Sequence, residues 1–302
     1  TCTSIAKQRP EGGWLWKISG NGLSHPSYLF GTYHGTYDIL YQYTDSIPEL
    51  YQAFNACSQF AGESETTSKP TPAQVGAAIK LPKDTTYADL LNKEDFHFLD
   101  SIVRQSLKSP LNKVYIKPNF LALILGEIEK GKKLVDTGYS QSRIDSMKSQ
   151  VMDIALEKKA KEKGLTIVGL EGIFDAFVSE KSNLKKEADE LISDLREDDE
   201  ISPLSFVNTL SDVYRTQNMK SLINFEVKVD SIFRTSPKLT EIGKRIREDL
   251  LKRRNLNWMN KIPELMKAQP TFIAVGVRHL PGKDGLIALL LEKGYQVEPI
   301  GL

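Results

Sequence analysis

The sequence predicts an α/β protein with a central mixed sheet built from both ends of the chain, flanked by helices and carrying a helical insertion. Short apolar runs near each end of the chain, at residues 28–33 and 272–275, have the length of buried strands. Longer stretches, at about residues 71–163 and 183–250, instead show apolar residues at helical spacing. The chain has 302 residues, 40% of them hydrophobic, which is enough for a sizeable core.

Composition and charge argue against several classes of protein. The net charge is +1, so no nucleic-acid partner or anionic membrane surface is expected. No apolar run has the length of a transmembrane helix. The two cysteines, Cys2 and Cys57, form no zinc-binding pattern, and their pairing as a disulfide stays open.

The N-terminal residues carry features of an exported protein. We expect residues 1–13 to be a flexible leader remnant and residues 14–302 to form a single domain. Ser4-x-Ala6 resembles the cleavage site of an export signal, and a lipid anchor on Cys2 is the other interpretation. Both predict a protein of the periplasm, the cell envelope or the extracellular space.

The first elements are two strands and a helix. Residues 14–19 alternate between apolar and polar, and residues 28–33 follow after glycine and proline turn signals, which predicts a hairpin. The second of these strands leads into His34. A short amphipathic helix at residues 48–58 then precedes a third strand at residues 59–65, which ends in the acids Glu63 and Glu65.

Helices are expected next, and strands return near the C-terminus. Thr71 followed by proline is a helix start signal, and residues 87–107 form one apolar-periodic helix of the insertion. Residues 165–172 predict a strand and residues 173–178 a short helix. The run at 272–275 is then a buried strand, followed by a loop and a last short helix.

The same local pattern follows two of the predicted strands. Gly31-Thr32-Tyr33-His34 and Gly276-Val277-Arg278-His279 each place a histidine three residues after a glycine. A histidine at the C-terminal end of a strand is where α/β proteins usually carry chemistry, although one copy is equally explained by a hydrogen bond to its turn. Two copies favour a functional site, because the first and last strands of a sheet can lie side by side, so that both imidazoles point into one cleft. His25 and His97 are expected in a turn and on a helix, with no assigned role.

These motifs resemble the paired Gly-x-x-His motifs of the TraB/GumN family, which is similar to the Tiki metalloproteases and to pheromone-shutdown proteins. Arg254-Asn255-x-x-Trp258 resembles a further landmark of that family, before the last buried strand. The resemblance runs from about Trp14 to Pro299 and is weaker in the middle. It implies an exported or envelope-associated protein.

The leading hypothesis from this resemblance is a metal-dependent hydrolase, above all a peptidase, with a peptide or a small molecule as its substrate. His34, Glu63 and His279 would hold one divalent ion and leave a position open for water, which is the usual layout of a catalytic metal site. Mn, Co and Zn all stay open as the metal. No His-Glu-x-x-His is present, so the ordinary zincin arrangement is excluded.

Further acids are candidates for the general base. Glu171 lines the cleft, orients a histidine or caps the helix after it, and these roles are not separated by sequence. Glu65 stands where the family has an aspartate, so its role is open. Asp153 matches an acid that is common in the family, but a position on a helix surface explains it equally well.

Arg254 and Asn255 are candidates for stabilising an oxyanion or binding a substrate carbonyl, since a guanidinium fork suits oxygen anions. The other interpretation is that Arg254 pairs with Glu63 or Glu171 and holds the site together. Trp258 is expected in the core.

Two other functions stay open. A metal-free, esterase-like hydrolase would use one histidine to activate water, and the other histidine together with Glu63 would orient it. A binding protein would retain a peptide or another small ligand without turnover. The substrate, the identity of the metal and the oligomeric state are not determined by the sequence.

Overall fold

The computed structural model describes residues 12–33, 41–65, 70–148, 150–175, 183–196 and 210–301. The chain divides into two compact units. Unit 1 contains Thr1–Ser68, Met147–Ile173 and Ile201–Leu302, and unit 2 contains Lys69–Ser146 and Phe174–Glu200. All but the last two residues of the expected leader lie outside the described residues. The single domain expected at residues 14–302 stays a prediction, because compact units of one chain need not fold separately.

A mixed sheet forms the centre of unit 1. Within the described ranges it has six strands in the order β4-β3-β5-β2-β1-β6. The parallel pairs are β2 with β5, β5 with β3, and β3 with β4, whereas β1 is antiparallel to both β2 and β6. The strands are β1 (Leu15–Ser19), β2 (Ser27–Thr32), β3 (Gln59–Gly62), β4 (Thr166–Gly169), β5 (Thr271–Gly276) and β6 (Gln296–Pro299). Strands from both chain ends share one sheet, which confirms the predicted α/β class.

The two strands that precede the Gly-x-x-His motifs lie side by side. In the parallel pair of β2 and β5, Gly31 lies opposite Val275 and Thr32 opposite Gly276. Every residue of β5 is buried, as expected for a central strand covered on both faces. The C-terminal ends of β2 and β5 are therefore neighbours at one edge of the sheet.

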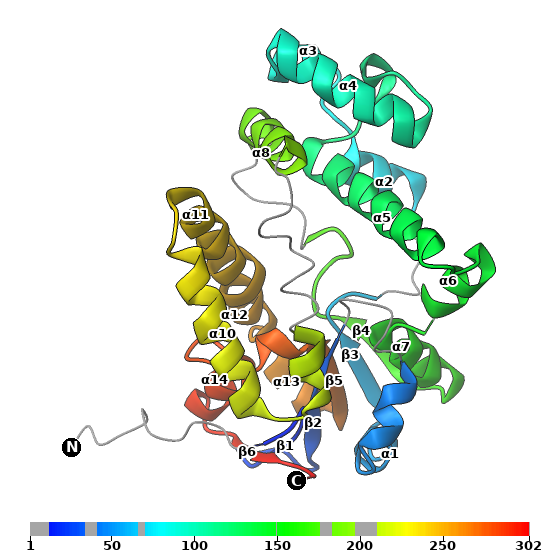
Figure 1. Ribbon diagram of the computed structural model, residues 1–302. Helices are drawn as coiled ribbons and strands as arrows, with labels where there is room; N and C mark the ends of the chain where they lie inside the picture. The colour runs from blue at the N-terminus through cyan, green and yellow to red at the C-terminus, as the bar shows by residue number, and fades with distance from the viewer. Residues whose placement is uncertain are drawn as a thin grey trace. The chain divides into compact units, whose positions relative to one another are not determined.

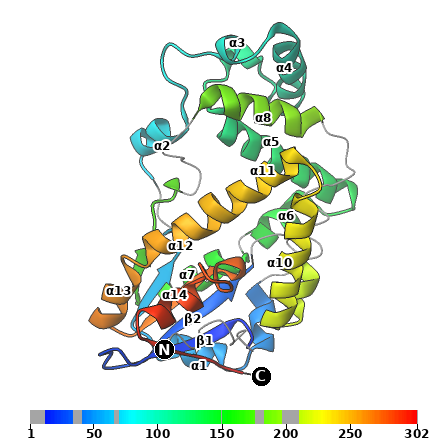
Figure 2. The same ribbon diagram turned by 90° about the vertical axis from the view of Figure 1, so that its left-hand side faces the viewer.

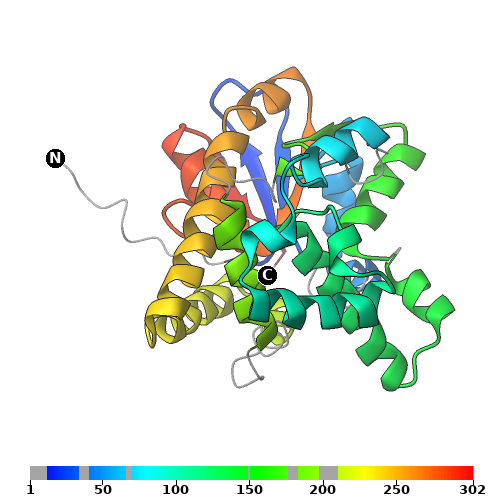
Figure 3. The ribbon, with the colours of Figure 1, turned by 90° about the horizontal axis from the view of Figure 1, so that it is seen from above.

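Helices of unit 1 cover both faces of this sheet. Figures 1 and 3 show α12 and α14 on one side of the strands and α1 and α7 on the other. The helical elements of this unit are η2 (Tyr41–Ser46), α1 (Leu50–Asn55), α7 (Met152–Glu162), α10 (Met219–Phe233), α11 (Pro237–Arg245), η5 (Ile246–Lys252), α12 (Arg253–Trp258), α13 (Ile262–Ala268), η6 (Val277–His279) and α14 (Leu286–Glu292). Figure 2 shows α11 and α12 as one continuous rod, joined by the π-helical turn η5.

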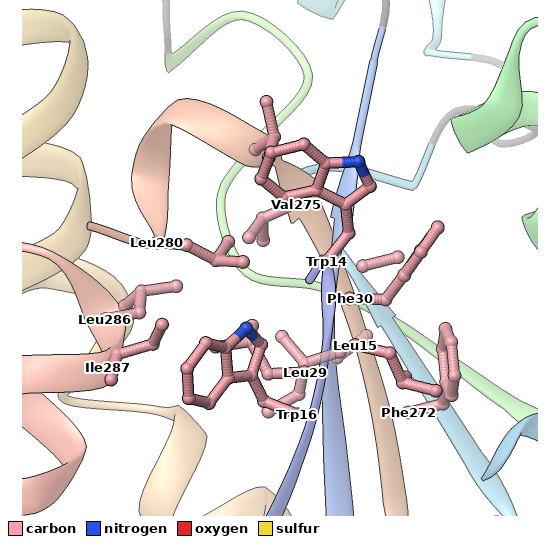
Figure 4. Close-up of a cluster of buried hydrophobic side chains, with 14 of the residues drawn as sticks. Trp14, Leu15, Trp16, Leu29, Phe30, Phe272, Val275, Leu280, Leu286 and Ile287 are labelled. Carbon is pink, nitrogen blue, oxygen red and sulfur yellow. The ribbon is translucent and has the colours of Figure 1, made fainter. Parts of the chain in front are cut away.

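The core lies on both sides of the strands because successive side chains of a strand point to opposite faces. In Figure 4, Trp16 lies on the same side as Leu286 and Ile287 of α14, whereas Leu15 and Phe272 lie on the other side. All five side chains are buried. Packing on both faces holds the ends of β2 and β5 in fixed positions, which is what a site at that edge requires.

Unit 2 is helical in the residues that are described. It contains α2 (Pro72–Ile79), α3 (Tyr87–Leu90), α4 (Lys93–Leu107), η3 (Leu111–Lys113), α5 (Pro118–Asp136), most of α6 (Gln141–Lys148) and α8 (Leu184–Arg196). Thr71 caps α2 as its sequence predicts, because its hydroxyl accepts a hydrogen bond from the backbone of Gln74. The unit has its own buried core, which includes Leu99, Val103 and Leu121.

Several boundaries differ from the sequence prediction. The helix expected at residues 87–107 is two helices, because Asn92 accepts a hydrogen bond from the backbone of Asp95 and caps α4. The sequence pattern does not predict β6, which has four residues, three of them exposed. Residues 173–175 of the helix expected at 173–178 form a turn, and its remainder lies outside the described residues.

Two further expectations can be compared with the structure. No helix in the described ranges combines the length and the apolarity needed to cross a membrane. Cys57 is a free thiol, and burial raises its pKa to about 12. A thiol in this environment behaves as a small apolar side chain of the core rather than as a nucleophile.

The loop after His279 depends on a glycine. A Cβ at Gly285 would lie 2.1 Å from the carbonyl oxygen of Pro281 and 2.4 Å from that of Leu280. Gly285→Ala is therefore expected to lower the free energy of unfolding by about 1–3 kcal/mol, as overpacking usually does. Urea-induced unfolding measures this. The matched control is Gly126→Ala on α5, where a Cβ would meet no described atom within 4 Å; it should be neutral or stabilising. Equal effects of the two substitutions would contradict the close-approach argument.

Candidate active site

Three candidate residues converge at the edge where parallel strands end. Glu63 follows β3 directly, Glu171 lies two residues beyond β4, and His279 ends the short helix η6 after β5. The backbone continues the strand pairing here, since the amide of Glu171 donates to the carbonyl of Glu63 at 2.8 Å. Because β3, β4 and β5 are parallel, their C-terminal ends meet at one edge, which is where α/β proteins place ligands.

The guanidinium of Arg254 lies at the centre of this group. Its Nη2 donates to Glu63 Oε2 and to Glu171 Oε1, each at 2.5 Å, and its Nε donates to Glu171 Oε1 at 2.9 Å. Its Nη1 lies 3.2 Å from Nε2 of His279. One cation therefore contacts all three of the residues delivered by β3, β4 and β5.

The cluster is shielded from solvent. The side chains of Arg254 and Glu171 are each 11% exposed and that of Glu63 is 16% exposed. Burial, the largest single effect on Arg254, lowers its pKa, but hydrogen bonds and charge from Glu171 and Glu63 together outweigh burial and raise the pKa above its ordinary value. Arg254 is therefore a permanent cation that offsets the two carboxylates.

Glu63 is held by a second contact. Its Oε1 accepts a hydrogen bond of 2.7 Å from the backbone amide of Gly276, at the end of β5. The same oxygen lies 3.8 Å from Nε2 of His279. Glu63 thus joins the end of β3 to the Gly-x-x-His motif that follows β5.

Helix α12 brings three side chains to this edge. Arg254, Asn255 and Trp258 are buried, while Leu256 and Asn257 between them are exposed. The spacing of these buried residues is that of one inward face of a helix. The landmark Arg-Asn-x-x-Trp of the sequence is therefore the face of α12 that lines the candidate site.

Trp258 contributes more than core packing. Its Nε1 donates to Glu171 Oε2 at 3.0 Å, and its ring lies 4.5 Å from the ring of His279, centroid to centroid. The guanidinium carbon of Arg254 lies 4.7 Å from the Trp258 ring, within the range of a cation–π contact. The prediction of Trp258 as a core residue did not include its hydrogen bond to Glu171.

The first Gly-x-x-His motif is described up to Tyr33. The hydroxyl of Tyr214 donates to the carbonyl of Gly31 at 2.7 Å, and Thr32 Oγ1 donates to Asp153 Oδ1 at 2.7 Å. A Cβ on Gly31 would lie 2.9 Å from Cγ2 of Val277, so glycine permits close approach of the two motifs. His34 lies outside the described residues, and its role as a metal ligand stays a prediction.

Neighbouring helices hold both motifs from outside. Asp153 lies in the first turn of α7, and its bond to Thr32 connects that helix to the end of β2. Arg278 makes a two-pronged ion pair with Glu226 of α10, at 2.6 and 2.9 Å. The sequence suggested Asp153 only through the family resemblance, and it carried no signal for Glu226.

The remaining predicted residues lie away from the charged cluster or at the surface. Glu65 is 42% exposed and pairs with Lys161 at 3.6 Å. His25 and His97 are exposed, in a turn and on α4 respectively, as the sequence predicts. Of the two acids considered for a general base, Glu171 alone contacts Arg254 and Trp258 in the described structure.

Fold and site together define an α/β protein with a candidate active site at the C-terminal ends of its parallel strands. The chain belongs to the TraB/PrgY/gumN family, whose model matches residues 14–299. It is similar to the metalloprotease TIKI2 of Danio rerio, with 22% identity over 332 aligned residues. That alignment covers 98% of this chain and 62% of the relative, so the chain spans less than two thirds of the relative's length. The comparison with solved structures found no match.

Arg254→Met should destabilise the protein strongly, because it leaves two carboxylates buried without their cation. Removing one partner of a buried ion pair usually costs about 3–5 kcal/mol. Arg254→Lys keeps a charge but cannot form the fork, so an intermediate loss is expected. Thermal and urea-induced unfolding measure both losses.

Arg253→Met is the matched control for this prediction. Arg253 is the preceding residue of α12, its side chain is 32% exposed, and its contact with Asp249 is 3.9 Å long. An exposed pair of this kind contributes about 0–1 kcal/mol. If Arg254→Met and Arg253→Met lowered stability equally, the central role of Arg254 would be refuted.

Proposed function

We propose that the chain is a hydrolase that acts on peptides with the help of one divalent metal ion, at the edge formed by β3, β4 and β5. The observation that carries this proposal is the convergence of Glu63, Glu171, Arg254 and His279 at one shielded sheet edge. Membership of the TraB/PrgY/gumN family and the similarity to a metalloprotease support the same class of reaction.

The described residues fit part of a metal site. No group of three or more His, Cys, Asp and Glu in the described ranges could hold an ion, and His34, the third expected ligand, lies outside them. Glu63 Oε1 and His279 Nε2 are 3.8 Å apart and could contribute an oxygen and a nitrogen ligand. Arg254 Nη1 would have to leave Nε2 for an ion to bind there, since the two compete for one lone pair.

The metal ligands in this proposal are His34, Glu63 and His279. When bound, a divalent ion supplies a Lewis acid that polarises the scissile carbonyl and lowers the pKa of water. Mn, Co and Zn are all compatible with a mixed nitrogen and oxygen ligand set, so the proposal does not choose among them.

Arg254 stabilises the oxyanion that develops on the attacked carbonyl with the Nη1 hydrogen that faces His279 Nε2, which an ion bound to Nε2 would release. A guanidinium offers several donors in a rigid fork, and its charge acts strongly where water is largely excluded. Glu171 orients this fork, because it accepts hydrogen bonds from both Nε and Nη2 of Arg254. The fork is thus already positioned before substrate binds, which is what gives such donors their effect.

Glu171 is also the better candidate for the general base. It is a shielded carboxylate within the cluster, whereas Glu65 is 42% exposed and pairs with Lys161. In this role Glu171 takes a proton from the attacking water and passes it to the leaving amine. Glu171→Gln should therefore reduce turnover much more than Glu65→Gln. Equal effects of the two substitutions would show that Glu171 is not the general base.

Export belongs to the same proposal. Ser4-x-Ala6 resembles the cleavage site of an export signal, which supports a substrate in the periplasm, at the cell envelope or outside the cell.

Metal content tests the proposal most directly. After dialysis against Mn, Co and Zn in turn, we expect about one ion per chain by elemental analysis for one of them. His279→Ala, Glu63→Gln and His34→Ala should each lose that ion and hydrolysis of a peptide library, because each removes one of three ligands. His25→Ala and His97→Ala are matched controls, since both histidines are exposed and outside the cluster.

Each other result points to a different function. Hydrolysis without metal, lost in His279→Ala, would replace the proposal by the metal-free hydrolase. Tight retention of a peptide with no product would replace it by a binding protein. Metal retained equally in all variants would show that the ion binds elsewhere and would contradict the proposed site.

A further inference from the structure

The amide of Asn255 is held in one orientation by the loop after His279. Its Nδ2 donates to the carbonyl of His279 at 3.2 Å and to the carbonyl of Asp284 at 2.8 Å. Both acceptors are backbone oxygens, which have no hydrogen to offer, so the NH₂ group must face them. Asn255 is 2% exposed, and its two amide hydrogens are both used in this way.

The oxygen of the same amide faces the imidazole of His279. Asn255 Oδ1 lies 2.7 Å from His279 Nδ1. An amide oxygen only accepts hydrogen bonds, so Nδ1 must carry the hydrogen. In the neutral imidazole the lone pair is then on Nε2.

Contacts on the other side of the ring agree with this assignment. Arg254 Nη1, which only donates, lies 3.2 Å from Nε2. His279 is 4% exposed, and the ring of Trp258 lies against it, so the imidazole is held on several sides. The lone pair of Nε2 is consequently directed at Arg254 and Glu63.

We infer that Asn255 is a positioning residue that fixes His279 in the Nδ1–H tautomer and so presents the Nε2 lone pair to the charged cluster. A hydrogen bond at one ring nitrogen generally decides which nitrogen is protonated and which is available to a ligand or a proton. This role differs from stabilising an oxyanion with the Asn255 side chain, which needs amide hydrogens that the two carbonyls already use. The inference deepens the proposed function, since the presented lone pair is the one that a metal ion or a proton would take.

Long-range ¹H–¹⁵N correlation spectra of the histidine side chains test the inference on the 302-residue chain labelled with [¹⁵N]histidine. The spectra are recorded with a chelator and without substrate, at pH about 9, well above the ordinary histidine pKa of about 6.5. The chain has four histidines, so the signals are few, and His279→Gln identifies those of His279.

The expected result is a protonated Nδ1 on His279 in the unmodified chain and a shift towards protonated Nε2 in Asn255→Ala. Asn257→Ala is the matched control, because Asn257 is an exposed asparagine of the same helix; it should leave the tautomer unchanged. Asn255→Asp keeps an oxygen acceptor for Nδ1, so it should retain the Nδ1–H form. A cooperative urea-induced unfolding transition like that of the unmodified chain shows that a variant is folded.

Three results would overturn the inference: a protonated Nε2 in the unmodified chain, an unchanged tautomer in Asn255→Ala, or loss of the Nδ1–H form in folded Asn255→Asp. An unchanged tautomer in Asn255→Ala would mean that Arg254 alone decides it. The spectra need neither metal nor turnover. A protein that shows the expected tautomer but neither binds metal nor hydrolyses peptides would therefore contradict the proposed function and leave this inference standing.

Discussion

The contact on which this site depends is the one between the guanidinium of Arg254 and two shielded carboxylates. Glu63 and Glu171 follow adjacent parallel strands, and both accept a hydrogen bond from the same nitrogen, Nη2 of Arg254. Without that cation, two carboxylates so placed would repel each other strongly in a medium of low polarity. Arg254 reaches them from a helix more than 80 residues further along the chain. Arg254 thereby connects the ends of β3 and β4 to α12 and to His279 at one edge of the sheet.

Such a cluster is a weak source of stability. Taking charges out of water costs several kcal/mol per ion, and well-packed apolar residues would often serve the fold equally well. Neighbouring groups also hold the two carboxylates in place: Trp258 donates a hydrogen bond to Glu171, and the amide of Gly276 donates one to Glu63. A shielded, fully hydrogen-bonded group of charges at the C-terminal end of parallel strands is better explained by chemistry than by folding.

Much of the fold could be predicted because its signals are local. The apolar runs of β2 and β5 have strand length, and Thr71 with its following proline begins α2. Where the signal is short or depends on partners, prediction fails. The four residues of β6 are mostly exposed and become a strand by pairing with β1, and Asn92 divides a helix that apolar periodicity alone continues.

The sequence by itself singled out five residues that the structure brings together: Glu63, Glu171, Arg254, Asn255 and His279 all follow strands or stand in the Arg-Asn-x-x-Trp landmark. Their catalytic roles stay predictions, as does the metal ligand His34. Only the tertiary structure decided which of these side chains contact each other. Arg254 pairs with both glutamates, and Asn255 uses its two amide hydrogens on backbone carbonyls and its oxygen on His279. Residue type and spacing specify a strand or a helix face. The partner of each side-chain hydrogen bond, by contrast, comes from a segment far away in the sequence, and only tertiary packing brings that segment into contact.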